Sequence, residues 1–306
     1  MTLLSEMAPA DLSPPPLRRL SADQMATWRA DGFLRIPALF SQAEIDIFHR
    51  FITTETEFRD GRVGVINAAG KPAELFGWSG HSEDLLGTMT RIRRVVDMTT
   101  DLLGGEDIYH WHSKISFKEP HSEGAWDWHQ DYGSWYREGC LRPEMLTCMI
   151  AIDATDRDNG CVNLVRGSHL MGRVDHVPIG QSVGTDPEFV EKALGDMELV
   201  ECDLAPGDAV FFHGNTLHAS GANTSDRNRT VLHLSYNTVR NAPFRGFDGH
   251  KYVPLQVLDD DTILSGTYRP GVDPANLWGK RSRDWKESRT ARNDYGYTVA
   301  PPRKAG

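Results

Sequence analysis

The sequence predicts a mostly β protein, a barrel or sandwich of short strands with helices supporting one face. Apolar residues recur at helical spacing in the first third of the chain. From about residue 110 they alternate with polar residues, in runs separated by Gly, Asn and Pro turns. Helices followed by many short strands are typical of a β-structure covered by helices. No glycine-rich phosphate-binding motif is present, which argues against a nucleotide-binding α/β fold.

The first third of the chain is expected to be helical. Ser21 and Ser41 are N-cap residues, the second within a capping box with Glu44, while Gly32 and the Gly104-Gly105 pair end helices. Residues 59–81 are glycine-rich without a clear period. In order we expect a flexible arm at 1–20, a helix at 21–29, a strand at 33–37, a helix at 41–55, a loop at 59–81 and a helix at 82–105.

The middle of the chain is expected to form the β core. A short helix is predicted at 187–194, and the tail beyond residue 250 contains Trp278 and Trp285, so we expect it to pack against the protein. The predicted strands are 110–118, 126–131, 145–153, 161–165, 197–204, 208–213 and 230–239. We therefore expect one domain over 21–306, with helical support at 21–105, a β core at 107–240 and a tail at 241–306.

Composition limits the classes of partner. The 306 residues carry a net charge of -10, which argues against nucleic acid. No apolar stretch approaches the roughly 20 residues that span a bilayer, and no signal peptide is recognisable. Four cysteines without C-x-x-C spacing predict free, buried thiols in a reducing compartment. We expect a cytoplasmic protein with a small-molecule substrate and no membrane partner, and we leave a homodimer open.

His129 and Asp131 are the candidate metal ligands that stand out. Side chains two residues apart on a strand point to the same face, so these two would lie together. Two other His-x-acid pairs begin at His81 and His121, and about two are expected by chance from 12 His and 43 acidic residues. Those two pairs lie in predicted surface segments, whereas His129 lies in an aromatic stretch where burial without a partner is unfavourable. A third ligand would complete the two-His-one-carboxylate site of non-haem Fe(II).

His218 is the expected third ligand. It follows the predicted strand 208–213 within a polar turn, the expected context of a metal ligand, whereas His213 is interpreted as a structural residue at the end of that strand. Ser220 and Arg229 come later in the same region. An arginine near the metal can pair with a dicarboxylate cosubstrate through two hydrogen bonds.

Several spaced motifs together resemble the phytanoyl-CoA dioxygenase superfamily, and residues 126–136 are similar to the ectoine hydroxylases within it. The resemblance covers roughly 33–240 and implies a double-stranded β-helix (a cupin-like jelly roll) that uses Fe(II), 2-oxoglutarate and O2. The motifs are W-H-Q-D at 128–131, D-x-x-D-x-x-N-G at 153–160, G-S-H at 167–169, P-G-D at 206–208, and H-x-S-G-x-N-x-S from residue 218, followed by Arg229.

The resemblance implies roles for individual residues. His129, Asp131 and His218 match the iron ligands, and Arg229 with Ser220 matches the pair that holds the distal carboxylate of 2-oxoglutarate. Related halogenases have a small residue in place of Asp131, so we expect oxygen insertion, chiefly hydroxylation, or a related oxidation and not halogenation. Further residues matched to the cosubstrate are Lys114, Ser116 and Gln130, although Gln130 should point away from the metal face. Those matched to the substrate are Trp135 and His112.

The substrate and one competing function remain open. Polar residues expected near the site, with the similarity to ectoine hydroxylases, favour a small polar metabolite or natural product over an acyl thioester; these residues are His112, Lys114, Arg137 and Arg240. The chief alternative is a cupin-like metal protein that does not oxidise, either an isomerase or a binding protein. That class needs the three ligands but has no need of Arg229.

Overall fold

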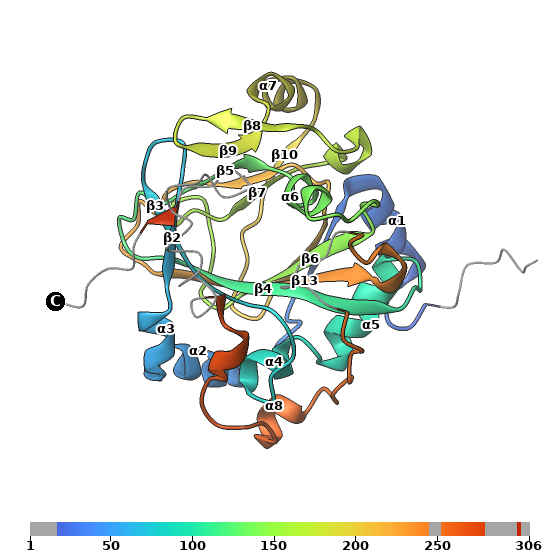
Figure 1. Ribbon diagram of the computed structural model, residues 1–306, viewed down its shortest axis with the longest axis vertical. Coiled ribbons are helices and arrows are strands. Elements are labelled where there is room, and N and C mark those ends of the chain that lie inside the picture. Colours follow the sequence, from blue (N-terminus) through green and yellow to red (C-terminus); the bar gives the residue numbers. More distant parts are fainter. Residues whose placement is uncertain (1–16, 245–251, 279–298, 301–306) are drawn as a thin grey trace, which may run out of the picture.

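The computed structural model describes residues 17–244, 252–278 and 299–300 (Figure 1). A large antiparallel sheet contains, in the order of pairing, β1 (Phe33–Ile36), β11 (Ala209–His213), β6 (Met145–Ala151), β13 (Arg229–Thr238), β4 (Ile108–Lys118), β3 (Pro72–Trp78), β2 (Val63–Ile66) and β14 (Val299–Ala300). A small antiparallel sheet contains β10 (Leu199–Glu201), β7 (Val162–Val165), β12 (His218–Ser220) and β5 (Trp126–His129). A separate hairpin pairs β8 (His176–Ile179) with β9 (Ser182–Thr185).

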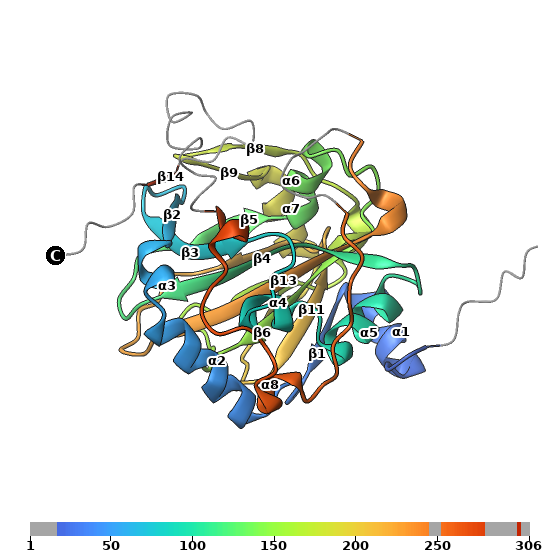
Figure 2. The same cartoon turned by 60° about the horizontal axis from the view of Figure 1, so that its bottom comes forward.

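Most of the helices cover one face of the large sheet, as the sequence predicts. The described helices are α1 (Ala22–Asp31), α2 (Gln42–Thr54), α3 (Thr56–Asp60), α4 (Leu85–Met89), α5 (Arg93–Leu102), α6 (Asp131–Arg137), α7 (Pro187–Asp196) and α8 (Thr262–Ser265). Figure 1 shows α2 to α5 and α8 on one side of the large sheet and the small sheet on the other, with α7 and the hairpin beyond it. The turned view in Figure 2 shows the same helices across the front of the large sheet.

Two apolar clusters hold these layers together. The larger joins the helices to the outer face of the large sheet, through residues such as Phe48, Val95 and Leu234. The second fills the space between the two sheets, where Met149 and Phe212 of the large sheet meet Leu164 of the small one. Odd-numbered residues of β6 and β13 therefore face the small sheet, because successive side chains of a strand point to opposite faces.

The helix starts follow the local signals in the sequence. Ser21 and Ser41 both form capping boxes, with Gln24 and Glu44 respectively. The backbone of Gly32 adopts a left-handed conformation, with φ of 77°, at the end of α1. These features confirm the expected helices after Ser21 and Ser41, and α7 confirms the helix expected at 187–194.

Two expectations for residues 59–105 are wrong. The predicted loop at 59–81 contains the end of α3 and the hairpin β2–β3, whose turn is closed by the Asn67 side chain accepting from the Lys71 amide at 2.8 Å. Glycines inside this hairpin hide its alternation in the sequence. The predicted long helix after Ser82 is divided into α4 and α5, because Ile92 is extended and forms a bridge with Leu258 of the distant tail.

The ends of the chain are only partly described. The expected arm at 1–20 lies mostly outside the described residues, but the backbone amides of Arg18, Arg19 and Leu20 all donate to the Asp101 carboxylate. The folded part therefore begins before residue 21. Of the two tail tryptophans, Trp278 packs on the large sheet, while Trp285 lies outside the described ranges.

Two predictions from composition can be checked against the structure. All four cysteines are buried and unpaired, as expected; they are Cys140, Cys148, Cys161 and Cys202. Within the described ranges, no helix has both the length and the apolar character that crossing a membrane requires.

Candidate active site

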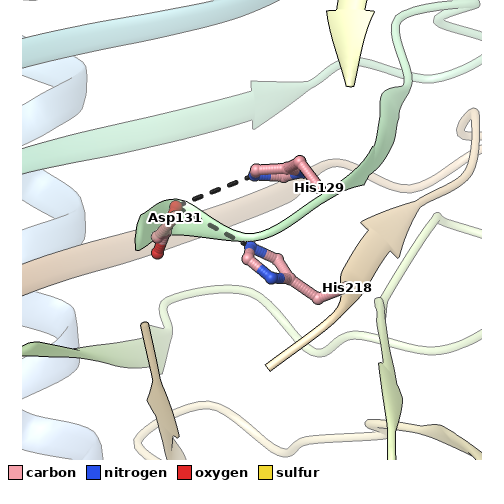
Figure 3. A group of neighbouring side chains, drawn as sticks. All are labelled: His129, Asp131 and His218. Carbon is pink, nitrogen blue, oxygen red and sulfur yellow. Dashed lines mark ion pairs between the residues drawn. The ribbon is translucent and has the colours of Figure 1, made fainter. Parts of the chain in front are cut away.

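The three expected metal ligands come together at one end of the small sheet (Figure 3). His129 ends β5 and His218 begins β12, and these two residues lie directly opposite each other in the sheet. Asp131 begins α6 two residues beyond His129. One candidate ligand atom from each of the three residues lies within 4.8 Å of the others. Among the described residues, this is the one group of His, Cys, Asp or Glu side chains with the spacing of a metal site.

The hydrogen bonds of the two imidazoles leave the correct nitrogen free. Nδ1 of His129 lies 2.7 Å from the carbonyl of Asp127, and Nδ1 of His218 lies 2.8 Å from the carbonyl of Thr216. Each Nδ1 therefore carries the proton, and each Nε2 keeps its lone pair. The Asp131 Oδ1 atom lies 3.7 Å from Nε2 of His129 and 3.9 Å from Nε2 of His218. Two imidazole nitrogens and one carboxylate oxygen suit Fe(II) and leave further coordination positions open.

The electrostatics of the cluster prepare it for a cation. Burial lowers the pKa of His129 and of His218, so both imidazoles are neutral at neutral pH. Burial alone would raise the pKa of Asp131, but electrostatic interactions with His218, Lys114 and His129 and a hydrogen bond from Thr147 outweigh it, and the pKa lies well below its usual range. The site thus presents one negative charge and two neutral nitrogen donors.

Two hydroxyl groups of the large sheet orient the Asp131 carboxylate. Thr147 on β6 donates from Oγ1 to Asp131 Oδ2 at 2.9 Å. Thr147 Oγ1 also lies 2.9 Å from Oγ of Ser235 on β13. Because the single Thr147 hydroxyl proton points to the carboxylate, Ser235 donates to Thr147. This chain directs Oδ1, the other carboxylate oxygen, toward the two imidazoles.

The expectation that His129 and Asp131 lie on the same face of one strand is wrong. The strand ends at His129 and Asp131 lies in the first turn of α6, so the two residues do not share a strand face. Gln130, between them, is completely buried. Its amide donates to the carbonyls of Gly172 and Asn215 and accepts from the Val174 amide. These bonds fix the turn from strand to helix and occupy the polar atoms of Gln130, so we do not retain its cosubstrate role.

Arg229 lies at the beginning of β13 with 1% of its surface exposed. Its Nη1 donates to Ser116 Oγ at 3.4 Å, and its Nε has no hydrogen-bond partner. No acidic residue in the described ranges forms a salt bridge with it. Burial lowers its pKa to about 10, so the guanidinium remains charged at neutral pH. A buried cation without a counter-ion is unfavourable, and an anionic ligand would relieve this.

Lys118 is a second buried basic residue at this position, which the sequence motifs do not identify. It ends β4 directly opposite Arg229, with 2% of its surface exposed. Its Nζ donates to the Ser220 hydroxyl and to the carbonyls of Ser220 and Gly221. Burial, followed by repulsion from Arg229, lowers its pKa to about 6, so the side chain is mainly a neutral amine at neutral pH. The alternation over 110–118 already placed Lys118 on the same face as Lys114 and Ser116.

Lys114 and His233 link this cationic end to the metal ligands. They are cross-strand partners on β4 and β13. The Lys114 ammonium lies 5.0 Å from the centre of the Trp126 ring, whose Nε1 donates to Ser116 Oγ at 3.3 Å. Burial, followed by the charges of Lys114 and Arg229, lowers the pKa of His233 well below its usual value. With Lys114, Ser116 and Lys118, His233 forms an interior row of polar residues on β4 and β13.

The two residues matched to the substrate differ in position. Trp135 is only 2% exposed and lies on α6 in an aromatic cluster with Tyr109 and Tyr132. His112 is half-buried on β4, and its ring centre lies 5.9 Å from that of Trp135. Any contact between Trp135 and a substrate would therefore be made beside His112.

The other polar residues considered for the site have structural partners. Nδ1 of His213 accepts from the amide of Asn215, which agrees with its structural interpretation. Arg137 donates to the carbonyl of His176. Arg240 is exposed and bound to Glu144, so we do not retain it as a substrate residue.

Comparison with known proteins supports the expected class. The sequence profile of the family described as phytanoyl-CoA dioxygenase (PhyH) matches residues 28–231. An L-proline trans-4-hydroxylase of Streptomyces griseoviridis is 27% identical over 72% of this chain and 88% of that protein. An ectoine dioxygenase of Stutzerimonas stutzeri is 28% identical over 82% of this chain and 88% of that protein. The crystal structure of EctD from S. alaskensis with 2-oxoglutarate and 5-hydroxyectoine has a TM-score of 0.63 at 19% identity, over 78% of this chain and 88% of that chain.

The structural match confirms the double-stranded β-helix, since the two facing antiparallel sheets superpose on that fold. The profile match covers the three ligand residues and Arg229. The cofactor is Fe(II), with 2-oxoglutarate and O2 as cosubstrates. The chain belongs to the phytanoyl-CoA dioxygenase (PhyH) family of Fe(II)- and 2-oxoglutarate-dependent dioxygenases.

Proposed function

We propose that this enzyme hydroxylates an unactivated C–H bond of a small polar metabolite or natural product and releases succinate and CO2. The observation that carries the proposal is the pairing of a two-His-one-carboxylate cluster with a buried, unpaired arginine on the same interior face. A metal protein that does not oxidise would need the cluster, but it offers no reason to bury Arg229 without a counter-ion.

Two groups of residues, at opposite ends of the interior, would bind the metal and the cosubstrate. His129, Asp131 and His218 would hold the metal on one side and leave its other side free for ligands. Arg229 would bind the distal carboxylate of 2-oxoglutarate, and Ser220 would assist. Bound iron, with 2-oxoglutarate and O2, supplies the oxidising power for C–H cleavage. The apolar cluster between the sheets would keep water from this space.

Further polar residues would help to hold the metal and the cosubstrate in place. Ser116 accepts from both Arg229 and Trp126, so it would hold the guanidinium in place beside the cosubstrate. Lys114 would supply a positive charge between the metal and Arg229, where it can attract the cosubstrate or an anionic group of the substrate. Asp131 would occupy the position that a halide takes in related halogenases, which supports hydroxylation.

The proposed substrate class is supported by the relatives, whose names specify ectoine and L-proline. Both are compact molecules that carry charge. His112, Lys114 and His233 offer this interior polar and charged groups that could orient such a molecule.

Two measurements test the function. Fe(II) should be titrated anaerobically with and without 2-oxoglutarate, and a visible metal-to-ligand charge-transfer band should form only when both are present. Succinate release should then be measured across amino acids, ectoine, acyl thioesters and polar natural products, with product mass recorded. Failure of the band to form with folded protein would refute the oxygenase site. A product with one added oxygen supports hydroxylation, while stimulation by acyl thioesters alone would refute the polar-metabolite proposal.

A further inference from the structure

The C-terminal segment 252–278 returns to the large sheet beside β3. Leu277 forms an antiparallel bridge with Trp78, the last residue of β3. Both side chains belong to the apolar cluster beneath the helices. The Trp278 ring lies instead against Gly77 of β3 and beside His112 of β4, so it occupies the other face, toward the space between the sheets. Figure 2 shows this segment, coloured red, crossing the sheet near β3.

Gly77 provides the space that the Trp278 indole occupies. A Cβ atom at Gly77 would lie only 2.2 to 2.5 Å from three carbon atoms of the indole ring. The ring therefore lies directly against the backbone of β3, and any larger residue at this position would displace it. A glycine within a strand often marks such a close approach.

Trp278 lies beside the interior row of polar residues on β4 and β13, which includes Lys114. Gly77 is the cross-strand partner of Lys114, whose charge acts on all three ligands. The Trp278 ring also meets His112 edge to face, with ring centres 5.3 Å apart and planes at 79°. His112 and Lys114 share one face of β4, since they are two residues apart. The indole is half-buried, so part of its surface is open.

We propose that Trp278 forms a wall of the substrate pocket and limits the size of the molecule that reaches the metal. The residue lies outside the stretch matched by the family profile, which ends at residue 231. A rigid indole face suits a compact substrate with an apolar or cationic surface. The inference rests on the proposed function, because it assumes that a small substrate binds beside the metal and the cosubstrate.

Substitutions on both sides of the contact test the proposal in the full-length enzyme. For the compound that wild type oxidises best in the panel above, Trp278→Ala should raise KM at least tenfold, and Trp278→Phe should raise it less. Gly77→Ala should act in the same direction by displacing the indole, and should add little in the Trp278→Ala background. Leu264→Ala is the matched control, since Leu264 lies in the same segment, 53% exposed on α8. A KM within twofold of wild type for Trp278→Ala would overturn the proposal.

A second measurement needs no substrate and remains decisive if the variants fold poorly. Wild-type protein labelled with 5-fluorotryptophan is loaded with Mn(II) and 2-oxoglutarate, and 19F resonances are assigned with single Trp→Phe variants. Paramagnetic broadening by Mn(II) should be strong for Trp126, whose ring centre lies 6.5 Å from that of His129. It should be greater for Trp278 than for Trp78, which belongs to the cluster on the opposite face.

The outcomes separate the inference from the function on which it rests. Equal broadening of Trp278 and Trp78, with Trp126 broadened, would overturn the pocket-wall proposal and leave the metal site intact. No broadening of Trp126 would contradict the metal site itself, and the pocket-wall proposal with it. Strong broadening of Trp126 and Trp278 together supports both.

Discussion

Thr147→Val tests whether the hydroxyl behind Asp131 tunes the metal site. The substitution keeps the shape of the side chain but removes the hydrogen bond from Thr147 Oγ1 to Asp131 Oδ2, at 2.9 Å. Without it, the carboxylate loses a donor that lowers its pKa and fixes its orientation. The ligand residues themselves are unchanged, so any effect on metal binding must come through the orientation or basicity of Asp131.

The expected magnitude follows from the type of bond removed. A hydrogen bond to a charged group is worth about 1.5–3 kcal/mol. At 1.4 kcal/mol for each factor of ten, its full loss would weaken metal binding roughly 10- to 100-fold. Removal of outer-shell partners of metal ligands has effects of the same order, about 10- to 100-fold. Ser235→Ala should have a smaller effect, because Ser235 reaches Asp131 only through Thr147.

Calorimetric titration with Mn(II), at fixed pH and with excess 2-oxoglutarate, measures this affinity without turnover. Thr155→Val is the matched control, since Thr155 is equally buried and donates at 2.9 Å to the carbonyl of Cys202 instead of a ligand. Both variants should lose similar folding stability, but only Thr147→Val should lose metal affinity. Metal affinity within twofold of wild type for a folded Thr147→Val protein would refute the reasoning.

Three further predictions concern the cationic end of the site and the buried histidines. Arg229→Leu should weaken 2-oxoglutarate binding at least 100-fold while Mn(II) binding in its absence is retained; a change below threefold in an anaerobic charge-transfer titration would contradict the anchor role. Lys118→Met should weaken 2-oxoglutarate binding by up to about tenfold, as expected for loss of a hydrogen-bond donor to Ser220, and Lys118→Arg should restore part of it; equal affinity for all three proteins would exclude this supporting role. Burial lowers the pKa of His176 and His213 to about 4, so the folded protein takes up these protons less readily than the unfolded chain, whose histidines titrate near 6.5. These two histidines should therefore leave the stability of the metal-free protein unchanged well above pH 6.5 and lower it by about 1.4 kcal/mol each by pH 5.5 in urea unfolding, whereas a free energy of unfolding that did not change over this range would show that these histidines titrate normally.

Residue type, spacing and the family resemblance were sufficient to select His129, Asp131 and His218 as candidate ligands, and the structure brings these three residues together. Arg229 was selected as the candidate cosubstrate anchor by the resemblance, and the structure shows that it is buried. The expected shared strand face of His129 and Asp131 was wrong, because Asp131 begins a helix and does not continue the strand of His129. The short separation of the two residues along the chain keeps them close in either local conformation.

The supporting residues could not be predicted in the same way. Thr147 and Ser235 meet Asp131 because β6 pairs with β13 beside α6, and Lys118 lies opposite Arg229 because of the register between β4 and β13. Sequence spacing carries no direct record of such register, since residues more than 80 positions apart become neighbours. The hairpin β2–β3 was missed for a related reason, because its glycines suit close packing but resemble a loop.

The sequence by itself determined the β architecture, the helix caps and the three candidate metal ligands, because each depends on local periodicity or on the chemistry of single side chains. Only the tertiary structure decided the burial of Arg229 and what surrounds the ligands: the hydroxyl chain behind Asp131, the second basic residue beside Arg229 and the return of Trp278 over Gly77. These depend on strand pairing and on the path of a distant segment, which are settled by burial of the whole chain and not by any stretch of it.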